Sequence, residues 1–160
     1  MFHLKMNHMK KIILLFLFFV QFSSFGQEIN PRNEFKNGLG LKIGGPTRIL
    51  ALNYNHFFTQ NINLELGVGL IGAYAGVKYY FGSADKVMRF APYVGAQLFS
   101  TVMSDNSILG FYMPFGVYLP FGVQLFSKNG FNLSLEASYL LLFDADGSRP
   151  GGSIHIGKNF

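Results

Sequence analysis

The sequence contains no cysteine and no tryptophan, and only 13% of its 160 residues are charged. Without cysteine the chain can form neither a disulfide framework nor a cysteine-ligated metal site, and it lacks the residue that is acylated in a lipoprotein. A soluble domain usually has about a quarter of its residues charged, so this chain has too few charges to cover a surface that faces water. Its hydrophobic content of 49% also excludes intrinsic disorder.

Long apolar runs are missing as well. The longest run, over residues 12–20, has nine residues, well short of the roughly 20 that a transmembrane helix needs. Three lysines precede this run, and the small residues Ser24 and Gly26 follow it. A positive start, a short apolar core and a small-residue exit predict a secretory signal peptide over residues 1–26, with cleavage after Gly26.

Removal of this leader changes the charge balance. Three lysines and no acidic residue leave with it, so the formal net charge falls from +5 to +2. The remaining lysines and arginines are scattered, whereas nucleic-acid binding needs a clustered basic face, so no nucleic-acid partner is expected. Residues 27–36 are polar and are predicted to be a flexible lead-in, which leaves residues 37–160 as one domain.

From residue 37 onwards, apolar and non-apolar residues alternate, which is typical of β-strands. No segment keeps a helical period over ten residues, and turn signals such as Asn129-Gly130 separate the alternating runs. The pattern predicts eight strands, over residues 37–44, 48–58, 61–72, 74–82, 89–103, 109–127, 130–144 and 151–160. Pro114 and Pro120 fall inside the sixth strand, where they predict a bulge, a bend or a weakly paired end.

The two faces of these strands distinguish two kinds of barrel. In a soluble barrel the apolar face points inward, whereas in a membrane barrel it meets lipid and the other face fills the lumen. The non-apolar face here carries Gly40, Gly67, Gly69, Gly76, Gly95, Gly116, Gly122, Gly157, Asn53, Asn55, Asn63, Gln97 and Gln124. Its few charges are Lys42, Glu65, Lys78 and Glu136. Because these charges balance, we expect them to form ion pairs inside a narrow lumen.

Aromatic residues gather near the predicted strand ends, where a membrane barrel carries two interfacial girdles. The residues assigned to the girdles on the apolar face are Phe57, Phe58, Phe81, Phe99, Phe126, Phe131, Phe143 and Phe160, with Tyr54, Tyr79 and Tyr139 nearby. The alternative is that these aromatic residues reflect only the general preference of strands for such side chains.

A signal peptide, eight short alternating strands, a glycine-rich face and a last strand that ends Gly157-Lys158-Asn159-Phe160 resemble the small eight-stranded outer-membrane barrels of the OmpA/OmpX-like class. The resemblance covers residues 37–160. It implies an all-β, antiparallel, up-and-down transmembrane barrel in the lipid of a Gram-negative outer membrane, with both termini in the periplasm. It also implies that the barrel-assembly machinery recognises the last strand through Gly157 and Phe160, although Lys158 stands where the class usually has an apolar residue.

One group of residues could carry chemistry. His155 is assigned to the lumen face of the last strand, and Ser138 and Glu136 to the lumen face of the strand before it. Serine, histidine and glutamate are the ingredients of an acyl-transfer site, so a lipid-modifying enzyme that uses His155 is an alternative function. The expectation is that these residues instead fill the lumen and that the protein is not an enzyme.

Metal binding, cofactor binding, protein binding and transport are the remaining function classes to consider. His56 and His155 are too isolated to form a metal site, and neither a cofactor nor a metal is expected. The predicted outward loops are short, so no protein partner is obvious. An eight-stranded barrel is just wide enough to be filled by side chains, which disfavours a pore. The leading hypothesis is a non-catalytic membrane barrel with a structural or surface-interaction role, and a further alternative is a secreted soluble ligand-binding barrel.

Overall fold

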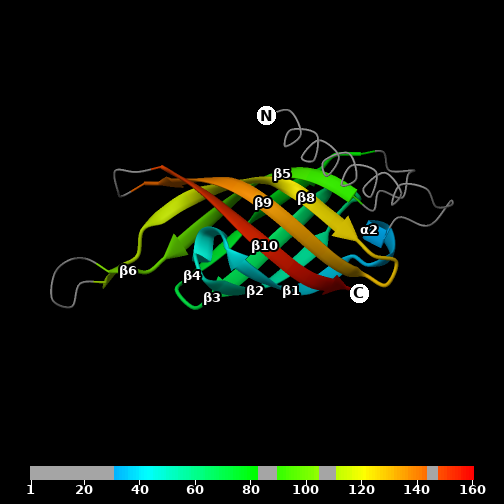
Figure 1. Cartoon of the computed structure of the whole chain (residues 1–160), viewed down its shortest axis with the longest axis horizontal. Coiled ribbons are helices and arrows are strands. Elements are labelled where there is room, and N and C mark those ends of the chain that lie inside the picture. Colours follow the sequence, from blue (N-terminus) through cyan, green and yellow to red (C-terminus); the bar gives the residue numbers. More distant parts are fainter. Residues whose placement is uncertain (1–30, 83–89, 105–110, 144–147) are drawn as a thin grey trace, which may run out of the picture.

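The structure is a computed structural model that describes residues 31–82, 90–104, 111–143 and 148–160. The predicted signal peptide and residues 27–30 lie outside the described residues. Eight strands close into an antiparallel barrel (Figure 1). They are β1 (Asn37–Gly44), β2 (Leu50–Phe57), β3 (Ile62–Gly69), β4 (Gly72–Tyr80), β5 (Phe90–Thr101), β8 (Phe115–Phe126), β9 (Phe131–Leu142) and β10 (Arg149–Asn159). In the described part of the chain no helix is long and apolar enough to cross a membrane.

The strand order confirms the predicted all-β, up-and-down fold. Each barrel strand pairs with the barrel strands that precede and follow it, and β1 closes the barrel by pairing with β10. At the closure Gly40 lies opposite Gly157 on one side and opposite Asn53 of β2 on the other. Closure leaves none of the eight strands with an unpaired edge, which is how a barrel avoids exposing backbone hydrogen-bonding groups.

The sixth predicted strand differs most from expectation. It is divided into two strands, β7 (Phe111–Tyr112) and β8. β7 pairs with β6 (Met103–Ser104) as a separate two-stranded ribbon. Pro114 lies in the break between β7 and β8. Pro120 lies within β8, where the pairing with β5 stops at Phe121 and resumes at Tyr118, while the pairing with β9 continues through Pro120. Proline has no amide hydrogen to donate to β5, so the predicted weak pairing is confirmed on one side of the strand.

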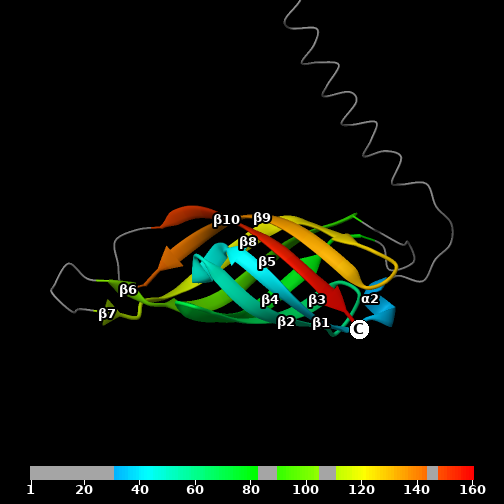
Figure 2. The same cartoon turned by 60° about the horizontal axis from the view of Figure 1, so that its bottom comes forward.

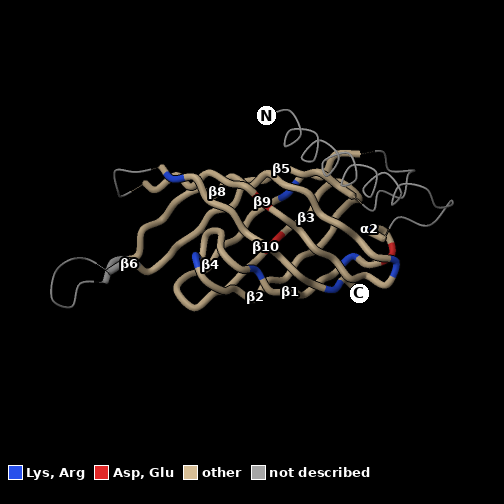
Figure 3. Tube along the Cα trace, in the orientation of Figure 1, with Lys and Arg blue, Asp and Glu red and all other residues tan. Residues whose placement is uncertain are grey.

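The barrel has its apolar residues outside and its polar residues inside. Large apolar side chains such as Val68 and Leu98 are 69% and 65% exposed on the outer surface. Amide, hydroxyl and charged side chains occupy the alternate positions and are buried in the lumen. Charged residues are sparse along the strands (Figure 3). The alternation of side chains along a strand places the two sets on opposite faces.

The assignment of three phenylalanines to the outer girdles is wrong. Phe57, Phe99 and Phe126 are only 1%, 3% and 3% exposed and lie inside the barrel. Phe57 and Phe126 each adjoin an outward-facing residue in the strand, and Phe99 is two residues from the inward-facing Gln97, so all three must point inward. The other members assigned to the girdles are exposed: Phe58, Phe81, Phe131, Phe143, Phe160, Tyr54, Tyr79 and Tyr139.

The inward phenylalanines belong to two clusters that fill different parts of the lumen. Phe57 and Phe126 pack in one cluster with Tyr80, Ala91 and Tyr93. A second cluster contains Ala51, Tyr74, Phe99 and Tyr118. Aromatic side chains bury a large area each, so these residues supply most of the apolar core of a barrel whose outer surface is not buried within the protein.

A short segment covers each end of the barrel. Residues 31–36, which were expected to be a flexible lead-in, include the helix α2 (Pro31–Glu34) and the fully buried side chain of Arg32. We call the barrel end that carries α2, Phe160 and the turn at residues 127–130 the plug end (Figure 2). At the opposite end, the loop end, the 3₁₀ helix η1 (Gly45–Thr47) contacts β4, β5 and β10, and its Thr47 is fully buried.

Candidate functional site in the barrel lumen

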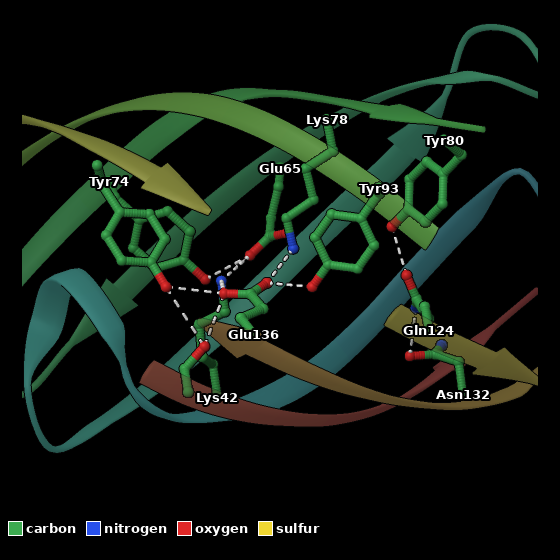
Figure 4. A network of polar contacts seen from close by, with 11 residues as sticks. Lys42, Glu65, Tyr74, Lys78, Tyr80, Tyr93, Gln124, Asn132 and Glu136 are labelled. Carbon is green, nitrogen blue, oxygen red and sulfur yellow. Dashed lines mark hydrogen bonds and ion pairs between the residues drawn. The ribbon is translucent and has the colours of Figure 1, made fainter. Parts of the chain in front are cut away.

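Four charged side chains meet in the middle of the lumen. They come from β1 (Lys42), β3 (Glu65), β4 (Lys78) and β9 (Glu136), and each is between 0% and 6% exposed. Every one of them occupies an inward position of its strand, so the alternation along the strands is sufficient to bring them inside. The structure therefore places all four predicted residues together in the lumen (Figure 4).

The four charges form a closed ring of ion pairs, which we call the charge ring. Lys42 Nζ lies 2.7 Å from Glu65 Oε1 and 3.1 Å from Glu136 Oε2. Lys78 Nζ lies 2.5 Å from Glu65 Oε2 and also pairs with Glu136 Oε1. Each lysine thus contacts both carboxylates and each carboxylate contacts both lysines. A ring of this kind has no net charge, which is the condition under which buried charges are tolerated.

Hydroxyl groups complete the hydrogen bonding of the carboxylates. Tyr74 donates a hydrogen bond of 2.8 Å to Glu65 Oε1. Tyr93 donates to Glu136 Oε1 at 2.7 Å, and Tyr118 and Ser153 donate to Glu136 Oε2 at 2.8 and 2.6 Å. These additional donors offset the loss of water from buried carboxylates, which ion pairing alone does not always do.

Aromatic rings also surround the two ammonium groups. Lys42 Nζ lies 4.9 Å from the centre of the Tyr74 ring, and Lys78 Nζ lies 4.5 Å from the centre of the Tyr93 ring. Both distances fall within the range of cation–π attraction. The tyrosines thus act on both signs of charge, with the ring face towards an ammonium group and the hydroxyl towards a carboxylate.

A second polar chain runs from the lumen to the plug end. Tyr80 donates to Gln124, whose Nε2 donates to Asn132 Oδ1 at 3.0 Å. Asn132 Nδ2 donates to Asn159 Oδ1 at 2.7 Å, and Asn159 Nδ2 donates to the carbonyl oxygen of Phe35 at 3.3 Å. The chain thereby connects β4, β8, β9 and β10 in turn and attaches the segment at residues 31–36 to the barrel wall.

The candidate catalytic residues are all in the lumen but are separated by the register of β9 and β10. His155 lies opposite Ser134, whereas Ser138 lies opposite Gly151. His155 Nε2 has no hydrogen-bond partner among the described residues. Glu136 lies opposite Ser153 and is committed to the charge ring and its hydroxyl donors. An acyl-transfer site requires the nucleophile within hydrogen-bond reach of its base, and this register does not bring Ser138 and His155 opposite each other.

The other candidate residues, His56, Gly157 and Phe160, are not part of the charge ring and make contacts with neighbouring strands. His56 Nδ1 lies 2.8 Å from Asn37 Oδ1 on the outer side of β2. Gly157 lies opposite Gly40 at the closure, and Phe160 is exposed, with its amide donating to the carbonyl of Asn37 at 2.7 Å. Within residues 31–82, 90–104, 111–143 and 148–160, no three His, Asp or Glu residues are grouped in a way that could hold a metal ion.

The sequence pattern did not lead us to predict Tyr74 or Arg32 as lumen residues. Tyr74 lies four residues before Lys78 on the same strand, so the alternation that placed Lys78 inside could have placed Tyr74 there too. Arg32 lies before the first strand, where no periodic pattern indicates which way a side chain points. Nothing in the sequence would have distinguished Arg32 from any other basic residue of a polar lead-in.

Fold and lumen together define a closed eight-stranded antiparallel barrel with an apolar exterior and a polar, charge-paired interior. The chain is similar to the N-terminal β-barrel domain of OprF from Pseudomonas aeruginosa in its crystal structure, with a TM-score of 0.58 and 16% sequence identity. The match covers 78% of this chain and 96% of that domain. No protein-family model matches the sequence, and no curated protein matches it either.

Proposed function

We propose that the chain is an integral barrel of the Gram-negative outer membrane, exported through a cleaved signal peptide, with a structural or surface-interaction role and no catalysis. The observation that supports this best is the polarity of the barrel: Lys42, Glu65, Lys78 and Glu136 are buried inside, while leucine, valine and isoleucine side chains cover the outside. An outer surface of this kind would aggregate in water, whereas lipid solvates it.

Localisation and folding state test this proposal. We expect the protein in the outer-membrane fraction, resistant to extraction by urea or carbonate. Unboiled samples should migrate differently from boiled samples in SDS gels, because a closed barrel keeps its hydrogen-bonded shape in detergent until it is heated. Recovery of a soluble periplasmic protein whose migration does not change on boiling would instead support a secreted ligand-binding barrel.

The filled lumen argues against a pore. The charge ring crosses the middle of the lumen, and the aromatic clusters together with Arg32 and Thr47 fill its two ends. In planar lipid bilayers the purified barrel should therefore give no stable conductance steps, as expected when the interior of an eight-stranded barrel is occupied by side chains. Stable, large steps from the heat-modifiable species would contradict the closed-lumen proposal.

The even number of antiparallel strands places both termini of the barrel at the same end. Both termini of the barrel lie at the plug end (Figure 1), which we place in the periplasm, so the loop end with η1 and the ribbon of β6 and β7 would face outward. In this orientation Phe160 stands at the periplasmic end of β10, where the barrel-assembly machinery would meet it. Among the described residues, the register that separates His155 from Ser138 gives no support to the alternative of a lipid-modifying enzyme that uses His155.

A further inference from the structure

Three aromatic rings line the plug end of the lumen. They come from three different strands: Phe57 from β2, Tyr80 from β4 and Phe126 from β8. The ring centres of Phe57 and Tyr80 are 5.3 Å apart, and the Phe126 ring lies 6.0 Å from Phe57 and 6.1 Å from Tyr80. We call this group the aromatic cage.

The guanidinium group of Arg32 sits against this cage. Its Cζ atom lies 5.6 Å from the centre of the Tyr80 ring and 6.0 Å from that of Phe126. Its Nη1 atom donates a hydrogen bond of 2.6 Å to the carbonyl oxygen of Gln60, in the turn between β2 and β3. Arg32 is 1% exposed, and this burial lowers its pKa from the ordinary value, but an arginine side chain keeps its charge in proteins.

Hydrogen bonds attach the segment that carries Arg32 to the barrel wall. Within the segment, the Phe35 amide donates to the carbonyl of Pro31 at 2.9 Å. The carbonyl of Phe35 accepts from Asn159 on β10, and the carbonyl of Lys36 accepts from the amide of Phe57 on β2 at 2.8 Å. Residues 31–36 are therefore attached to β10 and β2, the two strands that flank β1. From this side of the barrel, Arg32 reaches the rings of Tyr80 on β4 and Phe126 on β8.

We propose that the plug end is a guanidinium-binding site, formed by the rings of Tyr80 and Phe126, which pack against Phe57, and by the carbonyl of Gln60, and that the chain fills it with its own Arg32 to close the lumen. A planar, weakly hydrated guanidinium group can lie over aromatic faces while its N–H groups reach a carbonyl. A lysine ammonium group is compact and strongly hydrated, so it suits such a site less well. The ligand class is thus an alkylguanidinium, whether on this chain or free.

Removal of the Arg32 side chain should leave a site that takes a free guanidinium compound. We expect ethylguanidinium chloride, titrated into the detergent-refolded Arg32→Ala chain, to give saturable NMR shift changes at Tyr80, Phe126 and the Gln60 amide. Ethylammonium chloride should bind about tenfold more weakly, because it lacks the planar group. The wild-type barrel should show neither set of changes, since Arg32 occupies the site. Equal, non-saturating shifts with both salts, or the same shifts in the wild type, would overturn the proposal.

A second measurement does not depend on added ligand. The Arg32→Lys chain keeps the charge but loses the planar group, so hydrogen exchange of the Phe35 amide should be at least about tenfold faster than in the wild type. An Asn129→Cys change in the exposed turn at the same end should leave that exchange rate unaltered and serves as the control. If Arg32→Lys protects the Phe35 amide as well as the wild type does, the site does not recognise guanidinium.

Discussion

Replacement of Lys78 by methionine should lower the free energy of unfolding of the refolded barrel by about 3–5 kcal/mol, the range found when one partner of a buried ion pair is removed. The change leaves Glu65 and Glu136 with Lys42 as their shared lysine in the charge ring, and gives the ring a net negative charge. Glu65 and Glu136 are only 3% and 6% exposed, so bulk solvent cannot replace the lost ammonium group. Urea titration in detergent, followed by the gel shift between folded and unfolded forms, would measure the loss.

Two variants separate this effect from a general sensitivity to lysine loss. Lys158→Met makes the same chemical change at an exposed position on the outer face of β10 and should leave stability within about 0.5 kcal/mol. The double variant Lys78→Met/Glu136→Gln restores neutrality to the ring, so its loss should be smaller than the sum of the two single losses. If Lys78→Met and Lys158→Met destabilise equally, or if the two lumen changes are additive, the charge ring does not act as one unit.

Introduction of a methyl group at Gly67 should cost about 3 kcal/mol. Gly67 of β3 lies directly opposite Tyr74 of β4, and a Cβ atom built on Gly67 would overlap the Tyr74 ring. In the Gly67→Ala variant the ring must move, which carries an overpacking cost of about 1–3 kcal/mol. Movement of the ring also breaks the hydrogen bond from its hydroxyl to Glu65, where a bond to a charged group contributes about 1.5–3 kcal/mol.

The same stability measurement can assign the cost to the contact between Gly67 and the ring. In a Tyr74→Leu background, where the ring is absent, Gly67→Ala should cost little beyond the loss caused by Tyr74→Leu itself. Gly151→Ala is the matched glycine control, because a Cβ atom there meets only the side-chain atoms of Leu140 and Ser138, which can move. An equal cost of Gly67→Ala with and without the Tyr74 ring would show that backbone strain, rather than this contact, makes the glycine necessary.

Alternation along the strands carried most of the fold prediction, since one rule places Lys42, Glu65, Lys78 and Glu136 on the inner face. The error at Phe57 arises where this rule is not applied strictly, because Phe57 and its neighbour Phe58 cannot both lie on the outer face. Register is a different quantity from alternation, because it depends on how far one strand slides along its neighbour. The sequence therefore could not tell whether His155 would lie opposite Ser138 or Ser134.

Arg32 shows another kind of limit. Arg32 is buried against side chains from β4 and β8, which come together with β2 only in the closed barrel. The sequence around Arg32 therefore does not indicate that its side chain is buried. Likewise, the position of Pro120 predicts weak strand pairing in β8, but the sequence does not indicate which neighbouring strand loses the hydrogen bonds. In both cases the deciding information lies in strands far away along the chain.

The origin of the charge ring in four separate strands has a consequence for the order of folding. Its members come from β1, β3, β4 and β9. The ring is therefore complete only when strands from the N-terminal and C-terminal parts of the chain have met. Until that point any lysine or glutamate that left water would do so without all of its partners, at a cost of several kcal/mol. Partly closed intermediates are therefore disfavoured, and the final pairing of β1 with β10 should coincide with desolvation of the charges. Such long-range closure makes folding slow, and it makes the native barrel an all-or-none product.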